Sequence, residues 1–170
     1  VGMPKAEVVA RRLRDINPQI EINCIAGRYE AADRELFIAD YDYVVDAIDI
    51  VSCKLDLIIT CLERGIPIIS ALGTGNKRDA GLLRIDDISK TSNCALARVM
   101  RKELRERGVK HLRVIYSPEL PAKPEALEAP PPGRRSVPAS LTWVPGCAGL
   151  MMAGDVILTL AGYEKEGGSQ

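Results

Sequence analysis

Histidine and paired cysteines are scarce in this chain, and their scarcity narrows the chemistry it can perform. There is one histidine, and the five cysteines form no CxxC pair. An odd number of unpaired cysteines fits reduced thiols. We therefore expect no disulfide framework, no zinc knuckle and a cytoplasmic location.

An excess of charge and a long apolar run are also absent. Acidic and basic residues balance at 23 each, so no overall field points to nucleic acid or to a membrane. Any such partner must be recognised through a local patch. The apolar stretches are short or interrupted by glycine, aspartate and threonine, and we predict that none spans a bilayer.

The sequence has no initiator methionine, opens on VGMPK and enters a helical pattern almost at once, so we expect an N-terminally truncated domain. Its 170 residues suffice for one hydrophobic core. We predict a single domain over 1–162 and a disordered tail over 163–170. A flexible loop is expected over 117–135, which holds six of the eleven prolines.

Helical and strand patterns alternate through the first half of the chain. There we predict helices at 5–16, 31–39 and from Ser52 to Gly65, with strands at 20–24, 43–45 and 66–72. In the second half we predict strands at 82–85, 112–116 and 141–144, and helices at 94–108 and 146–161. This order predicts an α/β fold with a Rossmann-like, doubly wound sheet. The sheet should be parallel in its first half and mixed in its second, with helices on both faces.

The stretch 43–54 carries the clearest functional signal. A short apolar strand ends on Asp46 and Asp49, and a helix follows with Ser52 as a suitable N-cap. Acids at the carboxyl end of a strand face the crevice in which open α/β sheets bind ligands. The alternative is that both aspartates only end the strand and face water.

A basic stripe lies on the helix predicted at 94–108. Its members recur at helical spacing opposite the apolar face, and they are Arg98, Arg101, Lys102 and Arg105. Such a stripe can contact RNA phosphates. An ordinary solvated helix face is the alternative, because Glu103 and Glu106 dilute the charge.

Three further residues invite a functional interpretation, each with a simpler alternative. Cys94 stands at a helix N-terminus, which can lower the pKa of a thiol, but free cysteines are often buried structural residues. Lys77 ends the segment GTGNK, which can bring the backbone close to a substrate or cation. A glycine turn with a solvated lysine explains it equally well. The lone His111 is expected at the surface.

Four motifs together carry a family resemblance. They are GxPKxE at 2–7, DxxD at 46–49, GxGNK at 73–77 and DxxKT at 87–91. With these motifs, the chain resembles the ThiF/MoeB/HesA superfamily of ubiquitin-activating-type adenylating enzymes, and within it most the tRNA threonylcarbamoyladenosine dehydratases, the TcdA/CsdL group. The resemblance implies that Lys5 contacts ATP phosphates, that Asp49 is the catalytic acid that holds Mg²⁺-ATP, and that Asp46 supports it. It also implies tRNA as a partner and a homodimer.

Departures from the family pattern qualify this expectation. Ile50 stands where many relatives have asparagine, and the family's glycine-rich phosphate loop and its arginine would lie upstream of Val1. We therefore expect part of an ATP site and little or no turnover from this chain alone. Carrier-protein activators have two zinc-binding CxxC pairs, and thioester-forming relatives have a cysteine just before the final helix. This chain has neither, which favours the dehydratase group.

The function implied by the resemblance is ATP-dependent dehydration of N6-threonylcarbamoyladenosine in tRNA, a cyclisation through carboxylate activation. One alternative is adenylation of the C-terminal glycine of a ubiquitin-like or sulfur-carrier protein, with a sulfur-transfer or carrier protein as partner. Another is a noncatalytic dimerisation or binding module, in which the helix at 146–161 contributes to a dimer face.

Overall fold

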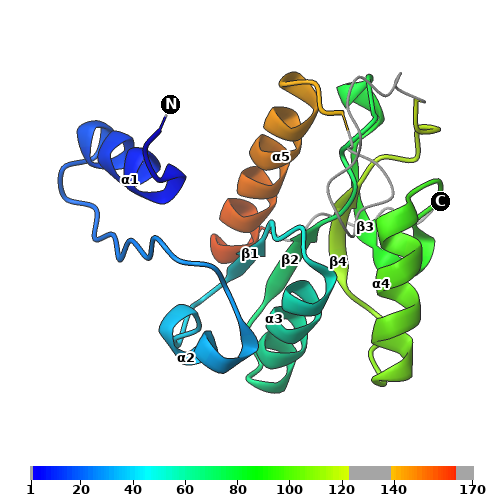
Figure 1. Cartoon of the computed structure of the whole chain (residues 1–170), viewed down its shortest axis with the longest axis horizontal. Helices are drawn as coiled ribbons and strands as arrows, with labels where there is room; N and C mark the ends of the chain where they lie inside the picture. The colour runs from blue at the N-terminus through cyan, green and yellow to red at the C-terminus, as the bar shows by residue number, and fades with distance from the viewer. Residues whose placement is uncertain (1, 123–138, 164–170) are drawn as a thin grey trace. The chain divides into compact units, whose positions relative to one another are not determined.

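The computed structural model describes residues 2–122 and 139–163, and its contacts divide the chain into two compact units, Val1–Ala39 and Asp40–Gln170. Figure 1 labels the elements of each unit. The single domain predicted over 1–162 remains a prediction. Most of the loop predicted at 117–135 and of the tail predicted at 163–170 lies outside the described residues.

The first unit contains helix α1 (Lys5–Ile16), the 3-10 turn η1 (Ala31–Asp33) and helix α2 (Arg34–Phe37). The predicted helix at 5–16 is confirmed, and the one at 31–39 is present as η1 followed by α2. The strand predicted at 20–24 is wrong, because this segment is irregular and pairs with no strand. Alternating apolar residues form a strand only where a neighbouring strand accepts their backbone hydrogen bonds.

The second unit is built on a four-stranded sheet of β1 (Val44–Asp46), β2 (Ile68–Ala71), β3 (Arg84–Asp87) and β4 (Arg113–Tyr116). The strand order is β1-β2-β4-β3. The β1–β2 and β2–β4 pairs are parallel, whereas β3 runs antiparallel to β4. The predicted mixed α/β sheet is confirmed. Parallel pairing brings the carboxyl ends of β1, β2 and β4 to one edge of the sheet.

Helices cover both faces of this sheet (Figure 1). They are α3 (Val51–Glu63), α4 (Ala95–Glu106) and α5 (Trp143–Leu160). Ile69 of β2 packs in the core cluster with Val144 and Met152 of α5, while the next residue, Ser70, hydrogen-bonds to Lys54 of α3. Because successive strand residues point to opposite faces, α5 and α3 lie on opposite sides of the sheet.

Two local predictions in the second unit are wrong. Residues 141–144 form no strand, because Trp143 already begins α5. Ser52 is not an N-cap, since α3 begins at Val51 with Ile50 before it and without a side-chain cap. Within α3, Leu62 is 41% exposed, whereas Lys54 is fully buried.

Helix α5 bears on the prediction that no apolar stretch spans a bilayer, which stays a prediction. With 18 residues, α5 is long and apolar enough to cross a membrane, judged by length and composition alone. One such helix is weak evidence for a membrane, because the core helix of a soluble protein can have the same composition. Asp155 in α5 is buried and forms an ion pair with Arg113 of β4.

Candidate functional site

Three polar side chains meet beneath the carboxyl edge of the sheet. Asp46 is the last residue of β1, Ser70 lies beside it on β2, and Lys54 comes from the second turn of α3. Lys54 Nζ donates to Asp46 Oδ2 at 2.5 Å, to Ser70 Oγ at 3.1 Å and to the carbonyl of Ala71 at 3.0 Å. Ser70 Oγ donates to Asp46 Oδ2 at 2.6 Å. This Lys54 cluster connects two parallel strands to the helix that covers them.

The Lys54 cluster is buried: the side chains of Lys54 and Asp46 are both 0% exposed. Burial lowers the pKa of Lys54 and is the largest cause, while the Asp46 and Asp49 carboxylates act in the opposite direction. A buried ion pair is tolerable only when its remaining hydrogen-bonding groups are satisfied, and here the ammonium has three acceptors. The cluster therefore holds its charges in a defined geometry.

The two predicted aspartates occupy one turn in different environments. Asp46 Oδ1 accepts a hydrogen bond from the amide of Ile48 at 2.9 Å, so both of its oxygens have partners within the protein. Asp49 is exposed at the end of the same turn, before α3. Asp49 thus offers a carboxylate to a ligand, whereas Asp46 is fully used in holding the turn.

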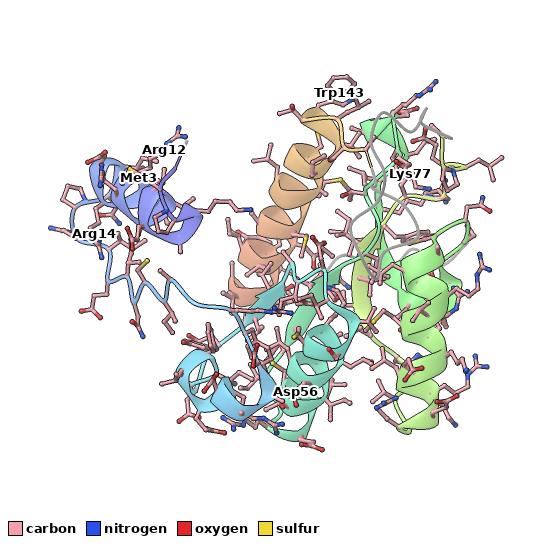
Figure 2. All side chains as sticks on the ribbon, in the orientation of Figure 1. Met3, Arg12, Arg14, Asp56, Lys77 and Trp143 are labelled. Carbon is pink, nitrogen blue, oxygen red and sulfur yellow. The ribbon has the colours of Figure 1, made fainter. Side chains whose placement is uncertain are left out.

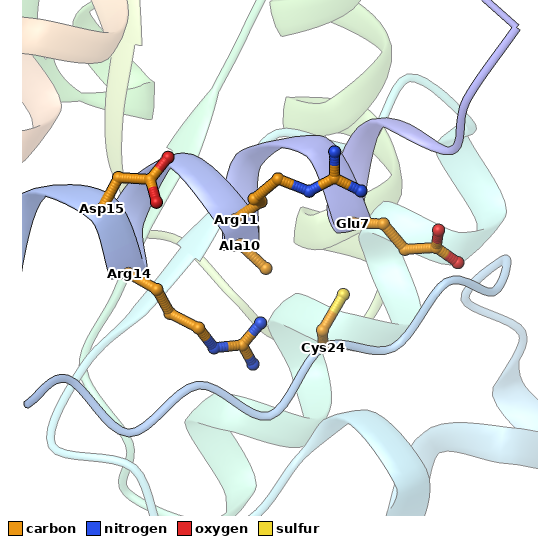
Figure 3. Close-up of a pocket in the computed structure, with 6 residues that line it drawn as sticks. All are labelled: Glu7, Ala10, Arg11, Arg14, Asp15 and Cys24. Carbon is orange, nitrogen blue, oxygen red and sulfur yellow. The ribbon is translucent and has the colours of Figure 1, made fainter. Parts of the chain in front are cut away.

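Lys5 is the first residue of α1, in the first unit, and its side chain is exposed. The first unit also has a pocket of about 400 Å³ that the sequence did not indicate (Figure 3). Its lining includes Glu7, Arg11, Arg14 and Asp15, and the guanidinium of Arg14 extends toward Cys24 in Figure 3. Two acids and two bases share this lining, which favours no single class of ligand.

The GTGNK segment follows β2, and its lysine is not solvated. Lys77 is 3% exposed and lies at the same end of the second unit as Trp143 (Figure 2). Its ammonium donates to the carbonyl of Asn93 at 3.1 Å and to that of Glu119. Burial is the main cause that lowers the pKa of Lys77. The alternative of a solvated lysine is therefore wrong.

Asn76 and the segment after it bond to residues on both sides of 123–138, which lie outside the described part of the chain. The backbone amide and the side-chain oxygen of Asn76 bond to Ala139, and its carbonyl accepts from the amide of Ala122. The Glu119 carboxylate accepts from the amides of Arg78 and Asp79 at 3.0–3.1 Å. The GTGNK motif thus has a structural role, because it ties Glu119, Ala122 and Ala139 together.

Cys94 occupies the N-cap of α4 as a buried residue. Its sulfur accepts from the amide of Ala97 at 3.4 Å, and the residue is 6% exposed. A Cβ added at Gly73 would lie 3.1 Å from that sulfur, so the glycine makes room for the thiol. These contacts favour the structural interpretation of Cys94.

The basic stripe on α4 is only partly available to a ligand. Arg98 and Arg105 are exposed, and Lys102 is exposed but lies 3.8 Å from Glu106. Arg101 is half-buried, and its guanidinium donates to the carbonyl and hydroxyl of Thr91.

A pocket of about 230 Å³ lies at the C-terminal end of this stripe, with four basic residues in its lining: Arg101, Arg105, Lys110 and His111. His111 is exposed, as predicted, and its Nδ1 lies 3.3 Å from Asp87 Oδ2. Asp87 belongs to the carboxyl end of β3, which is antiparallel to β4, so this pocket lies at the opposite end of the sheet from Asp46. The stripe and pocket can hold an anionic chain.

Sequence reasoning missed two members of the Lys54 cluster. Ser70 is a polar residue inside an apolar strand, and Lys54 interrupts the apolar side of α3. Each polar residue interrupts an apolar pattern, and this interruption was the signal by which the sequence could have indicated it. In the described part of the chain, no group of three His, Cys, Asp or Glu side chains is arranged to hold a metal ion. In the turn after β1, the exposed Asp49 offers one carboxylate to a ligand.

Comparison with known proteins agrees with this geometry. The ThiF family profile matches residues 1–169. The tRNA threonylcarbamoyladenosine dehydratase of Bacillus subtilis (strain 168) is 39% identical over 171 residues, which cover 94% of this chain and 67% of that protein. A solved structure of TcdA (CsdL) has a TM-score of 0.79 and 26% identity, covering 96% of this chain and 68% of that one.

The ATP complex of the E. coli tRNA N6-threonylcarbamoyladenosine dehydratase, TcdA, has a TM-score of 0.69 and 26% identity, covering 92% of this chain and 67% of that one. The matched relative and structures are thus about one and a half times as long as this chain, and the match covers nearly all of it. The chain belongs to the ThiF family.

Proposed function

We propose that this protein takes part in the ATP-dependent dehydration of N6-threonylcarbamoyladenosine in tRNA. The observation that carries the proposal is the exposed Asp49 carboxylate at the carboxyl edge of the sheet, in a chain similar over nearly its whole length to dehydratases of this kind. In the proposed reaction, the threonyl carboxylate attacks the α-phosphate of ATP and releases pyrophosphate; the carbamoyl group of the same nucleoside then attacks the activated carbonyl, which closes a ring and releases AMP. The net change is the loss of one water.

Asp49 holds Mg²⁺-ATP in this proposal. Carboxylate oxygen is the ligand type that Mg²⁺ prefers, with phosphate oxygens and water completing its shell, so one exposed acid is compatible with the site. Lys5 contacts the ATP phosphates. Asp46 supports the nucleotide site indirectly, because its oxygens are occupied by Lys54, Ser70 and the amide of Ile48.

The tRNA backbone contacts the stripe of Arg98, Arg101, Lys102 and Arg105. The exposed guanidinium groups of Arg98 and Arg105 support this assignment, since basic side chains supply most nonspecific affinity for nucleic acid. Arg101 is half-buried and donates to Thr91, so the exposed Arg98 and Arg105 carry most of the proposed contact.

A cytoplasmic homodimer is the expected assembly. Large apolar side chains on α5 remain exposed, among them Leu150 at 75% and Ile157 at 65%. A second copy would cover such a face. Light scattering on the protein and on its Leu150→Glu variant tests this: an unchanged monomer mass in both would contradict the dimer.

The experiment that tests the function uses the protein encoded by the whole gene, with ATP, Mg²⁺ and tRNA that carries threonylcarbamoyladenosine. Mass spectrometry of the digested nucleosides should show the loss of one water, and Asp49→Ala should abolish it. If the mass is unchanged but a small carrier protein stimulates ATP–pyrophosphate exchange, the enzyme activates carrier proteins instead. If both assays are negative, the protein is a noncatalytic binding module.

A further inference from the structure

A fully buried lysine next to the nucleotide edge is unusual because it must be desolvated. Lys54 is 0% exposed, and its ammonium is hydrogen-bonded within the protein to Asp46, Ser70 and the Ala71 carbonyl. Removing a charge from water costs several kcal/mol, and an apolar residue of similar volume often gives equal or greater stability at such a position. The fold gains little stability from Lys54, so its presence calls for another explanation.

A short chain of hydrogen bonds leads from Lys54 to the exposed acid. The ammonium binds Asp46 Oδ2 at 2.5 Å, and the other oxygen of that carboxylate accepts from the amide of Ile48 at 2.9 Å. Ile48 directly precedes Asp49. The orientation of the Asp46 carboxylate therefore determines where the backbone of the turn runs, and with it the position of the Asp49 side chain.

Two more contacts prevent the ammonium from moving. Ser70 Oγ and the Ala71 carbonyl accept from it at 3.1 and 3.0 Å, and both belong to β2, the neighbouring strand. The Asp49 carboxylate is also close enough to raise the pKa of Lys54, against the larger lowering by burial. Lys54 thus links β1, β2, α3 and the turn that ends at Asp49.

We infer that Lys54 is a positioning residue for nucleotide binding: through Asp46 and the Ile48 amide it fixes the turn that presents Asp49 to Mg²⁺-ATP. This inference rests on the function proposed above. Lys54 does not touch the nucleotide itself, because its side chain is inaccessible and its three donors are used within the protein. It acts as the residues behind a metal ligand do, which orient the ligand without contacting the ion.

The test measures KM for ATP and kcat of tRNA dehydration in the protein encoded by the whole gene. Lys54→Met should lower kcat/KM for ATP by about 10- to 100-fold, the usual effect of removing an orienting partner. Lys54→Arg keeps the charge and several donors and should restore part of the loss. Lys90→Met, at an exposed lysine paired with Asp86, is the matched control and should behave like the wild type.

A double variant separates loss of activity through unfolding from loss of activity through poor positioning of Asp49. Lys54→Met combined with Asp46→Leu removes both buried charges, so thermal unfolding should return toward the wild-type midpoint. If this double variant is stable but still defective with ATP, the positioning role is supported. If it regains normal kcat/KM, the cluster is only structural and the inference is wrong.

A third variant separates this inference from the proposed function. If Asp49→Asn leaves ATP use unchanged, the proposed nucleotide site itself is wrong. If Asp49→Asn is defective, adding Lys54→Met should cause little further loss, because both changes affect the same carboxylate. Fully multiplicative losses would mean that Lys54 acts independently of Asp49, which would overturn the positioning role alone.

Discussion

The ion pair between Arg113 of β4 and Asp155 of α5 connects the sheet to its longest helix, and its removal should destabilise the second unit. Arg113 Nε and Nη2 donate to the two carboxylate oxygens at 2.5 Å each, a bidentate geometry. The Asp155 side chain is 2% exposed, whereas that of Arg113 is 43% exposed. Arg113→Met would therefore leave a buried carboxylate without its arginine.

The expected loss of stability follows from the unequal exposure of the Arg113 and Asp155 side chains. Breaking a pair between two buried charges costs about 3–5 kcal/mol, and an exposed pair contributes about 0–1 kcal/mol. Because solvent screens only the arginine, we expect Arg113→Met to lower the free energy of unfolding by about 2 kcal/mol, or Tm by roughly 4–8 °C. Arg113→Lys should lose part of this, because lysine keeps the charge without the bidentate fork.

Urea unfolding followed by circular dichroism measures the effect, with an unchanged m-value as the sign that only stability has altered. Arg84→Met is the matched control, since Arg84 lies exposed on the adjacent strand β3 and forms no ion pair within the described residues. Equal unfolding midpoints for the Arg113 and Arg84 variants would refute the reasoning. Arg113→Met with Asp155→Leu should recover part of the loss, because no buried charge then remains at this contact.

Three further predictions concern Glu119, Asn76 and the basic pocket. Hydrogen bonds from the amides of Asp79 and Arg78 lower the pKa of Glu119 in the folded protein. The Glu119 carboxylate therefore stabilises the fold at pH values above the ordinary glutamate pKa, and this stabilisation is lost as the pH falls through the lowered pKa. Glu119→Gln should flatten that part of a curve of stability against pH. Asn76 has a φ of +59°, which glycine adopts without strain, so Asn76→Gly should lose only the side-chain hydrogen bond. Asn76→Ala should also strain the backbone, and urea unfolding should show a free energy of unfolding about 1 kcal/mol lower than that of Asn76→Gly. Arg105→Ala and Lys110→Ala should each reduce the salt dependence of tRNA binding by about one phosphate contact, measured by filter binding at several salt concentrations, and unchanged slopes would exclude the pocket.

Periodicity was informative wherever a segment's partners are local or apolar. The helix at 5–16 and the strands near Tyr43, Ile66 and Leu112 were predicted because their apolar spacing reflects a single buried face. The strands at 20–24 and 141–144 were predicted wrongly for the same reason. Short alternating runs satisfy the pattern, but only a neighbouring strand makes them part of a sheet, and none lies beside these two within the described residues.

Some residues of the candidate site could be found from the sequence, and others could not. Asp46 and Asp49 could be found from the sequence, because their place after an apolar strand puts them at the carboxyl edge. Lys54 could not be assigned, because a charged residue in a helix is expected to face water. Its burial depends on Asp46, eight residues earlier, and Ser70, sixteen residues later, which meet it only when β1 and β2 pair beneath α3.

By itself, the sequence determined the α/β class, the family and the location of the acidic edge, because these depend on local spacing and on motifs within short segments. Only the tertiary structure decided which charges are buried, that Lys77 is enclosed by carbonyl groups, and that Asp46 holds a turn rather than a ligand. The physical reason is that desolvation and hydrogen-bond satisfaction are properties of packed neighbours, and those neighbours come from distant parts of the chain.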